Sequence, residues 1–284
     1  MKSYFSLIKF SHTIFALPFA LIGFFLAVWI KSYDFQWSLF LLVLLCMVFA
    51  RSAAMAFNRY ADRFIDSQNP RTAKREIPAG VIASNSALIF VVVSSVAFVA
   101  TTYFINPLCF YLSPVALAVI LGYSYTKRFT FLCHFILGIG LSLAPIGAYI
   151  AVTERFDILP IFYSLAVLFW VSGFDIIYAL QDEEFDREKK LFSVPAYLGK
   201  KNALMLSNTL HIISAAFIVF AGIYASFGIF YWIGTIVFSG LLLYQHMLVK
   251  PNDLSKVNMA FATTNGVASV IFAIFVLIQF WMER

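Results

Sequence analysis

The sequence is poor in charged residues. Asp, Glu, Lys and Arg make up 12% of its 284 residues, whereas a soluble globular domain has about 25%. Hydrophobic residues make up 62%, and Phe alone occupies 33 positions. So little polar surface excludes a soluble fold of this size. The composition predicts a polytopic membrane protein that forms one domain over residues 1–284, with no separate soluble part.

Cysteine and histidine are also scarce, with three and four residues respectively. None of them has the spacing of a metal site, and the cysteines lie in or beside apolar segments without an even pairing. We therefore interpret the cysteines as packing residues and the histidines as packing or interfacial polar residues. The positions concerned are Cys46, Cys109, Cys133, His12, His134, His211 and His246.

Hydropathy predicts about nine transmembrane helices of ~20 residues each. Such runs are too long for the ~10-residue alternating strands of a membrane barrel, so the predicted fold class is all-α. The first run is expected to stay in the protein, because it is longer than a signal-peptide core and lacks a good cleavage site. The predicted spans are residues 13–30, 38–57, 87–104, 108–122, 133–152, 160–180, 208–227, 229–249 and 262–281.

Basic residues are concentrated in alternate loops. They lie at the N-terminus, as Lys2 and Lys9, and after the second, fourth, sixth and eighth predicted spans. The opposite side has only Lys31, Arg155 and Arg284. The positive-inside rule then predicts that the N-terminus and the basic loops face the cytoplasm of a bacterial inner membrane. The net charge of +6 reflects this asymmetry and not a nucleic-acid-binding surface.

The first acidic motif follows the second span. Asn58, Asp62 and Asp66 recur every fourth residue, so that on one continuous helix they drift by only ~80° and share a face. Oxygen ligands on one face can hold Mg²⁺, which completes its shell with waters and phosphate oxygens. The alternative is a solvated helix end stabilised by charge pairs.

The second acidic motif follows the sixth span. Asp175, Asp182 and Asp186 fall within ~40° of one another on a helical wheel, and Asp175 lies deepest, inside the apolar run. A carboxylate in a membrane span is costly and by default marks a functional site, the alternative being a structural pair with an Arg or Tyr. Glu183 and Glu184 point elsewhere on the wheel and are expected to be solvated. Both acidic loops continue through basic residues to Pro-Ala, which is a faint internal repeat.

Cations accompany both motifs at the predicted cytoplasmic face. Arg71, Arg75, Lys127 and Arg128 can bind a diphosphate and stabilise it as it leaves. The alternative is that these residues serve only to orient the chain. Arg51 lies within the second span, where an arginine usually pairs with an acid or a ligand, and the intramembrane aspartate is a candidate partner.

With these motifs in this order, the chain resembles the UbiA family of membrane aromatic prenyltransferases. The resemblance covers nearly the whole length and five segments, among them Tyr123-x-x-x-Lys127-Arg128 and Ser193 shortly before Gly199. It implies a nine-helix bundle with a cytoplasm-facing cavity, in which the two acidic motifs bind Mg²⁺ and the diphosphate of an isoprenoid donor. The other matching residues are Asn58, Asp62, Asp66, Arg71, Thr72, Arg75, Pro78, Gly80, Asp175, Tyr178, Ala179, Asp182 and Asp186.

The resemblance also implies a reaction. A polyprenyl diphosphate would lose its diphosphate beside the cations Arg51, Arg71, Arg75 and Lys127, and an electron-rich aromatic ring would attack the resulting allylic cation through carbon. The donor-bound Mg²⁺ ions would be held by Asn58, Asp62, Asp66, Asp182 and Asp186. Asp175, with Tyr178, would orient or deprotonate the ring hydroxyl, and Arg128 would bind an acceptor carboxylate.

Departures from the family pattern concern the acceptor. Arg59 stands where the family commonly has Asp, and Glu76 stands where Pro is usual. The N-terminal Lys9-Phe10-Ser11-His12 and Ala16-Leu17-Pro18-Phe19 look more like the branch associated with menaquinone made by the futalosine route than like typical 4-hydroxybenzoate enzymes. The expected acceptor is either 4-hydroxybenzoate or a related hydroxy-aromatic carboxylate such as 1,4-dihydroxy-6-naphthoate, and the resemblance does not choose between them.

Other functions compete with this interpretation. A secondary transporter would explain the spans, the repeat and the intramembrane charges, but it would place ionisable groups near the midplane and not at one face. CDP-alcohol phosphotransferases carry their aspartates in one glycine-bearing segment, which this chain lacks. Heme O, chlorophyll and tocopherol-type enzymes of the same family stay open. The expected partners are the donor, the acceptor and membrane lipid, with no obligate protein partner.

Overall fold

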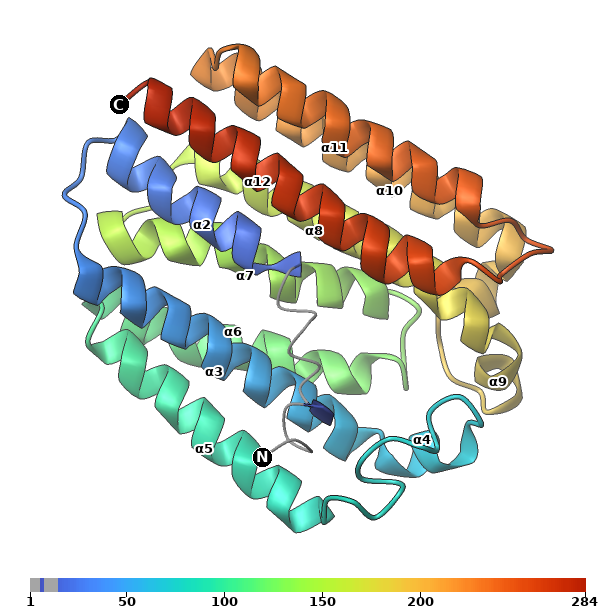
Figure 1. Ribbon diagram of the computed structural model, residues 1–284. Coiled ribbons are helices and arrows are strands. Elements are labelled where there is room, and N and C mark those ends of the chain that lie inside the picture. Colours follow the sequence, from blue (N-terminus) through green and yellow to red (C-terminus); the bar gives the residue numbers. More distant parts are fainter. Residues whose placement is uncertain (1–5, 8–14) are drawn as a thin grey trace. The chain divides into compact units, whose positions relative to one another are not determined.

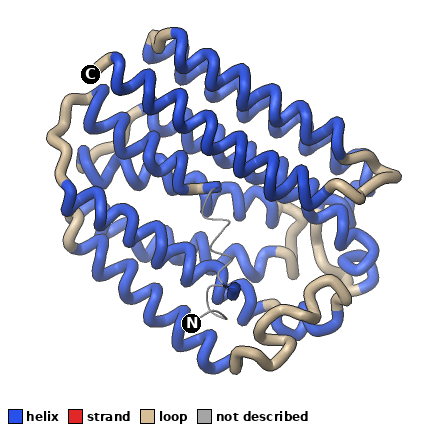
Figure 2. Tube along the Cα trace, viewed as in Figure 1, coloured by secondary structure: helices blue, strands red, loops and turns tan. Residues whose placement is uncertain are grey.

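The computed structural model describes residues 6–7 and 15–284, which are built almost entirely from helices (Figure 1). Among these residues there is no strand, only an isolated bridge between Lys250 and Asp253, as the predicted all-α class requires (Figure 2). Expectations for Lys2, Lys9 and His12 lie outside the described residues. The elements are α2 (Leu17–Phe25), η2 (Leu26–Ile30), α3 (Trp37–Ala61), α4 (Arg63–Gln68), α5 (Ser84–Tyr103), α6 (Pro107–Thr126), α7 (Cys133–Thr153), α8 (Ile158–Ala179), η3 (Leu180–Asp182), α9 (Glu183–Glu188), α10 (Val194–Ala225), α11 (Ile229–Leu248), η4 (Met259–Thr264) and α12 (Asn265–Met282).

In the described part of the chain, eight helical stretches are long and apolar enough to cross a membrane. They coincide with the second to ninth predicted spans. The fourth predicted span, residues 108–122 with Pro114, is a full helix over Pro107–Thr126. At the place of the first predicted span lies a shorter apolar helix, Leu17–Ile30. The number of membrane crossings therefore stays a prediction.

Helix α10 begins at Val194, well before the predicted start at residue 208. Ser193 caps it, because its Oγ accepts a hydrogen bond from the backbone N–H of Ala196 at 3.3 Å. Gly199 then adopts φ 75° and ψ 161°, a conformation open essentially to glycine, and the helix resumes beyond it. Gly199 and the polar residues Lys200, Lys201 and Asn202 lower the hydropathy of this stretch, so the span was predicted to begin later.

The helices divide into two compact units. Of the described residues, unit 1 contains 6–7 and Gln36–Tyr125, and unit 2 contains 15–35 and Thr126–Arg284. Within unit 1, α3 packs along α5, and buried Ala56, Ala87 and Val91 belong to its core. The predicted single domain over residues 1–284 stays a prediction.

Unit 2 is organised around α8, which packs against α7 on one side and α10 on another (Figure 1). Its core is rich in fully buried aromatic side chains, including Trp170, Tyr163 and Phe272. Helices α7 and α8 approach closely at Gly138, where an added Cβ would lie 2.5 Å from the carbonyl oxygen of Leu168. A glycine is required there because any side chain would force the two helices apart.

A polar cluster around Asp157 lies at the start of α8 in unit 2. Asp157 caps α8, since its Oδ1 accepts the N–H of Ile158 at 2.7 Å, and its Oδ2 contacts Tyr149 Oη at 3.0 Å and Lys31 Nζ at 3.2 Å. Burial alone would raise the pKa of Asp157, but these donors outweigh it and lower the pKa. The cluster ties the end of η2 to the connection between α7 and α8.

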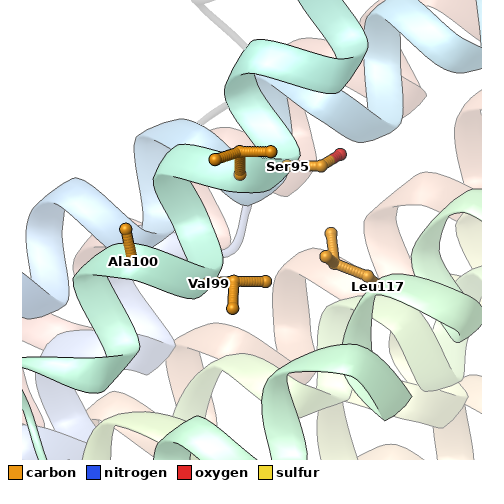
Figure 3. A pocket seen from close by; sticks show the side chains of 5 residues that line it. Ser95, Val99, Ala100 and Leu117 are labelled. Atoms are coloured by element: carbon orange, nitrogen blue, oxygen red, sulfur yellow. The ribbon is translucent and has the colours of Figure 1, made fainter.

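Unit 1 has a shallow hollow between α5 and α6 (Figure 3). It is lined by Ser95, Val96, Val99, Ala100 and Leu117. It is open and its accessible lining is apolar, so it offers no groups for binding a charged substrate. The functional residues must be sought at the ends of the helices.

Candidate functional site

The first acidic motif spans a break between two helices. Helix α3 ends at Ala61, and Asp62, with φ −93° and ψ 6°, separates it from the six-residue helix α4. The expected continuous helix is therefore wrong at Asp62. Helical backbone hydrogen bonds nevertheless link these residues at four-residue intervals. The backbone N–H of Asp62 donates to the Asn58 carbonyl at 3.0 Å, and the backbone N–H of Asp66 donates to the Asp62 carbonyl at 2.7 Å. The Asn58 amide also donates to Asp62 Oδ2 at 3.1 Å.

Asp66 is buried and bound by a cation. Its side chain is 7% exposed, and Nη1 of Arg75 lies 2.7 and 2.8 Å from its two carboxylate oxygens. Thr72 Oγ1 donates to the Asp66 carbonyl at 3.1 Å, which holds the following loop against the motif. Arg71 is exposed, and its backbone N–H donates to Asn69 Oδ1 at 2.9 Å. The loop after α4 thus places Arg75 against Asp66, a predicted metal ligand, whereas Arg71 of the same loop faces solvent.

The second acidic motif has the same break. Helix α8 ends at Ala179, a 3-10 turn leads to Asp182 with φ −104° and ψ 3°, and α9 follows as a six-residue helix. The continuous helix assumed for Asp175, Asp182 and Asp186 is therefore interrupted, and their common face stays a prediction. Both Asp182 and Asp186 are buried.

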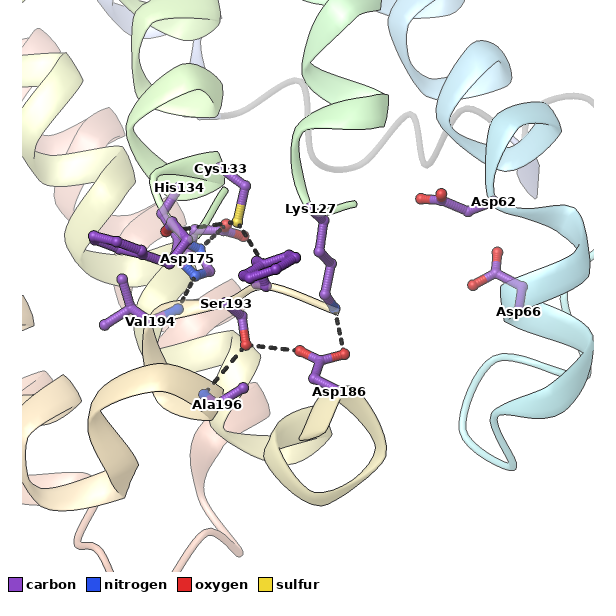
Figure 4. Close-up of polar contacts among 12 residues, drawn as sticks. Asp62, Asp66, Lys127, Cys133, His134, Asp175, Asp186, Ser193, Val194 and Ala196 are labelled. Atoms are coloured by element: carbon purple, nitrogen blue, oxygen red, sulfur yellow. Dashed lines mark hydrogen bonds and ion pairs between the residues drawn. The ribbon is translucent and has the colours of Figure 1, made fainter. Parts of the chain in front are cut away.

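Asp186 is held from two directions (Figure 4). Ser193 Oγ donates to its Oδ2 at 2.8 Å, and Lys127 Nζ lies 2.7 Å from its Oδ1. Burial alone would lower the pKa of Lys127, but the Asp186 carboxylate beside it outweighs that effect and the pKa is raised. Lys127 is therefore a cation at neutral pH, and Asp186 has a counter-ion supplied by the chain.

Asp175 is paired with a histidine. His134 Nδ1 lies 2.7 Å from Asp175 Oδ2, and the backbone N–H of Val194 donates to His134 Nε2 at 3.2 Å (Figure 4). From the sequence, the expected partner of Asp175 was an Arg or Tyr, and His134 was expected to be a packing or interfacial residue, so this contact was not predicted. The available signal was that His134 and Asp175 both lie within apolar spans, where two polar groups are costly unless they meet.

The remaining predicted site residues are positioned as follows. Tyr178 is half-buried and its ring stacks on Phe261 of η4, with centroids 4.2 Å apart. Arg128 is exposed beyond the end of α6, and Arg51 is half-buried in the middle of α3. Helix η4 is a π-helical segment, a feature that often occurs at functional sites.

One other expectation needs correction. Glu183 is buried and not solvated, and Arg187 Nη2 lies 2.6 Å and Lys200 Nζ lies 3.6 Å from its carboxylate. Glu184 is solvated as predicted, with 91% of its side chain exposed. His211 and His246, expected to be packing or interfacial residues, contact each other, with His211 Nδ1 2.9 Å from His246 Nε2. Periodicity cannot reveal such pairings between separate helices.

The two motifs share one local design, which strengthens the internal repeat seen in the sequence. In each, a long helix ends just before Asp62 or Asp182, a six-residue helix follows, and the buried aspartate four residues later is bound by a basic side chain. A glycine with positive φ follows each motif, Gly80 in the loop before α5 with φ 74° and Gly199 within α10 with φ 75°.

The donor sets fit Mg²⁺. No group of three or more His, Cys, Asp or Glu side chains gathers within the described residues. Mg²⁺ does not need one, because it is usually bound by one or two carboxylates and completes its shell with waters and substrate phosphates. Asp62 with Asp66 in unit 1, and Asp182 with Asp186 in unit 2, each offer that number of carboxylates.

Comparisons with known proteins agree with this chemistry. The model of the UbiA prenyltransferase family matches residues 16–281. A 4-hydroxybenzoate octaprenyltransferase from Aliivibrio salmonicida (strain LFI1238) is 32% identical over 174 residues. That alignment covers 60% of this chain and 60% of the relative, so the chain matches about six tenths of the length of this curated relative.

Solved structures show the same fold. The apo structure of a UbiA homologue from Aeropyrum pernix K1 has a TM-score of 0.85 and 32% identity, covering 94% of this chain and 97% of that one. A UbiA homologue from Archaeoglobus fulgidus bound to DMAPP and Mg²⁺ has a TM-score of 0.71 and 20% identity, covering 98% and 99%. The extent of the family match, together with the paired acidic motifs, leads to one conclusion: the chain belongs to the UbiA prenyltransferase family.

Proposed function

We propose that this protein is a Mg²⁺-dependent enzyme that transfers a polyprenyl group from a polyprenyl diphosphate to a hydroxy-aromatic acceptor in quinone biosynthesis. Membership of the UbiA prenyltransferase family supports the reaction class. The observation that carries the proposal is the duplicated motif, in which a buried aspartate is paired with Arg75 in one unit and with Lys127 in the other. A diphosphate with two bound metal ions needs this kind of duplicated, mixed-charge environment.

Two groups of oxygen ligands would hold the metal. We assign Asn58, Asp62 and Asp66 to one Mg²⁺ site and Asp182 and Asp186 to the other. When bound, Mg²⁺ neutralises the charge of the diphosphate and makes it a better leaving group. The A. fulgidus homologue, solved with DMAPP and Mg²⁺, is consistent with this metal.

Cations complete the donor site in this proposal. Arg75 and Lys127 hold two of the carboxylates in place and stand beside the ligands to which the diphosphate would bind. Arg71, which is exposed, and Arg51, within α3, would add positive charge for the diphosphate. Their common task is to stabilise the negative charge that develops as the C–O bond of the donor breaks.

The acceptor would be handled by the second unit. Breaking the C–O bond leaves an allylic cation, and an electron-rich ring forms the new C–C bond and then loses a proton. Asp175 would orient or deprotonate the ring hydroxyl, and the Tyr178 ring, stacked on Phe261, would provide part of an aromatic wall. Arg128 would bind the acceptor carboxylate, because a guanidinium matches that group bidentately.

Two acceptors are proposed in order of support. The name of the A. salmonicida relative supports 4-hydroxybenzoate. The N-terminal resemblance described above supports 1,4-dihydroxy-6-naphthoate. In both cases we expect the reaction at the cytoplasmic face of a bacterial inner membrane, within lipid and without an obligate protein partner.

Incubation of purified membranes with Mg²⁺, a polyprenyl diphosphate and each acceptor separately tests the proposal. We expect a prenylated product, detected by mass spectrometry, from one of the two acceptors. Membranes without the expressed protein provide the background. Absence of product and of diphosphate release with both acceptors would contradict the proposal and favour a transport function.

A further inference from the structure

The contact between His134 and Asp175 has a consequence for acceptor binding. We propose that His134 is a positioning residue that orients the Asp175 carboxylate toward the acceptor hydroxyl. This rests on the proposed function, in which Asp175 is the group that meets the acceptor. His134 Nδ1 lies 2.7 Å from Asp175 Oδ2, and the two side chains come from neighbouring helices, α7 and α8 (Figure 4).

The backbone determines which nitrogen of His134 carries the proton. The N–H of Val194 points at Nε2 from 3.2 Å, and a backbone N–H can only donate. Nε2 is therefore the acceptor, which places the ring proton on Nδ1. His134 consequently donates to Asp175 Oδ2, and a hydrogen bond to an ionised carboxylate is among the stronger ones.

This arrangement leaves one side of the carboxylate available. Among the described residues, Asp175 has its hydrogen-bond partner at Oδ2, and its side chain is 17% exposed whereas that of His134 is 3% exposed. Oδ1 can therefore accept the hydroxyl of a phenol while Oδ2 stays fixed. A carboxylate held at one oxygen has fewer orientations to lose when the acceptor binds.

His134 is itself anchored by a rigid segment. Three consecutive residues of this segment, Phe192 to Val194, each make a hydrogen bond. The Phe192 N–H donates to the Lys127 carbonyl at 2.7 Å. Ser193 Oγ donates to Asp186 Oδ2, and the Val194 N–H donates to His134 Nε2. These three consecutive residues form the connection before α10 and leave it little freedom. The same connection thus fixes Asp186 through Ser193 and Asp175 through His134.

Two substitutions separate the two hydrogen bonds of His134. The amide of His134→Asn reaches the place of Nδ1 and keeps a donor for Asp175, whereas that of His134→Gln reaches the place of Nε2 and keeps an acceptor for Val194. We expect kcat/KM for the acceptor to fall by about tenfold in His134→Gln, the size of one lost hydrogen bond to a charged group. In His134→Asn it should stay within about threefold of the wild type, and KM for the donor and the Mg²⁺ requirement should change by less than about twofold in both.

A purely structural role would give a different result. Both variants would then lose thermal stability together, and the kinetics of donor and acceptor would decline in parallel. That pattern, or a tenfold loss in His134→Asn, would overturn the inference. If His134→Gln does not accumulate in membranes, His134→Asn alone still decides.

A double-mutant cycle with Asp175→Asn supplies the second readout. In that background, His134→Gln should cost less than about twofold, because the carboxylate it positions is already gone. An undiminished tenfold loss would show that His134 acts elsewhere. The wild-type protein is assayed first. If it gives no prenylated product, both the proposed function and this inference are contradicted. If the wild type is active and His134→Gln is unaffected, only the inference is contradicted.

Discussion

At the scale of single residues, the buried aspartates are the most constrained groups in the molecule. Asp66 and Asp186 each lie under one tenth exposed, and each has a basic side chain within 2.8 Å. An ionised carboxylate removed from water is costly unless it is paired and hydrogen-bonded. Arg75 and Lys127 therefore stabilise the folded protein as well as serving the proposed reaction.

The Asp182→Ala substitution is expected to abolish turnover at every Mg²⁺ concentration tested. Asp182 is buried beside the break before α9 and is one of two carboxylates proposed to hold the metal in unit 2. Glu184→Ala is the matched control, since this nearby acidic side chain is 91% exposed, and it should retain normal rates. Prenyl transfer measured over a Mg²⁺ series checks both. A near-normal rate in Asp182→Ala would show that the metal assignment is wrong.

Lys127→Met is expected to destabilise the protein by about 1–3 kcal/mol, because it leaves the fully buried Asp186 without its counter-ion. The cost is smaller than for a completely buried pair, since 35% of the Lys127 side chain is exposed to solvent screening. Thermal unfolding in detergent measures the change. Mg²⁺ should restore part of the loss by replacing the missing positive charge. The exposed Lys201→Met serves as control, and equal melting temperatures for the two variants would contradict the prediction.

At the scale of elements, the close approach of α7 and α8 sets the geometry of the acceptor side. Gly138→Ala is expected to cost about 1–3 kcal/mol, because its Cβ would lie 2.5 Å from both the Leu168 carbonyl and Ser172 Oγ. Separating these helices also pulls His134 away from Asp175, so acceptor kcat/KM should fall with stability.

Gly147→Ala provides the control in the same helix. An added Cβ there meets nothing within 4 Å, so the substitution should change stability by no more than about 1 kcal/mol. Thermal unfolding and acceptor kinetics are measured on both variants. Equal behaviour of the two would show that the Gly138 contact does not determine the helix spacing.

Element positions could be predicted from the sequence far better than element ends. A helix needs ~20 apolar residues to cross the hydrocarbon core of a membrane, so apolar runs indicate where the membrane helices lie. The second to ninth predicted spans coincide with helices. The breaks at Asp62 and Asp182 could not be predicted, since no glycine or proline marks them. Four residues beyond each break, Asp66 pairs with Arg75 and Asp186 pairs with Lys127, and a helical wheel does not contain these contacts.

The sequence singled out candidate site residues but could not predict how they pair. The aspartates and cations were proposed as site residues because charges in an apolar chain are conspicuous, and their roles stay predictions. The partner of Asp175 was missed because it depends on which residue of another helix lies beside it, whereas Arg187, four residues after Glu183 in α9, was within reach of helical spacing and was overlooked. Ser193 was noticed by resemblance, and its link to Asp186 emerged only from the fold.

At the scale of the whole molecule, the charge asymmetry predicts the orientation in the membrane. In a cysteine-free background, Lys201→Cys should react with a membrane-impermeant maleimide only in inverted vesicles, and Arg155→Cys only in right-side-out vesicles. Both positions are exposed, and they lie in loops assigned to opposite sides by the positive-inside rule. Labelling by mass shift checks the prediction. The reverse pattern would place the acidic motifs outside the cytoplasm.

The internal ion pairs have a consequence for the order in which ligands arrive. Because Arg75 and Lys127 already compensate Asp66 and Asp186, the free protein gains little by capturing a lone metal ion. A donor that enters as its Mg²⁺ chelate can exchange these pairs in one event, with phosphate oxygens taking over the basic side chains. We therefore expect calorimetry to detect weak Mg²⁺ binding alone and much tighter binding together with a non-reactive diphosphate analogue. Equal affinities in the two titrations would mean that the metal binds first and independently.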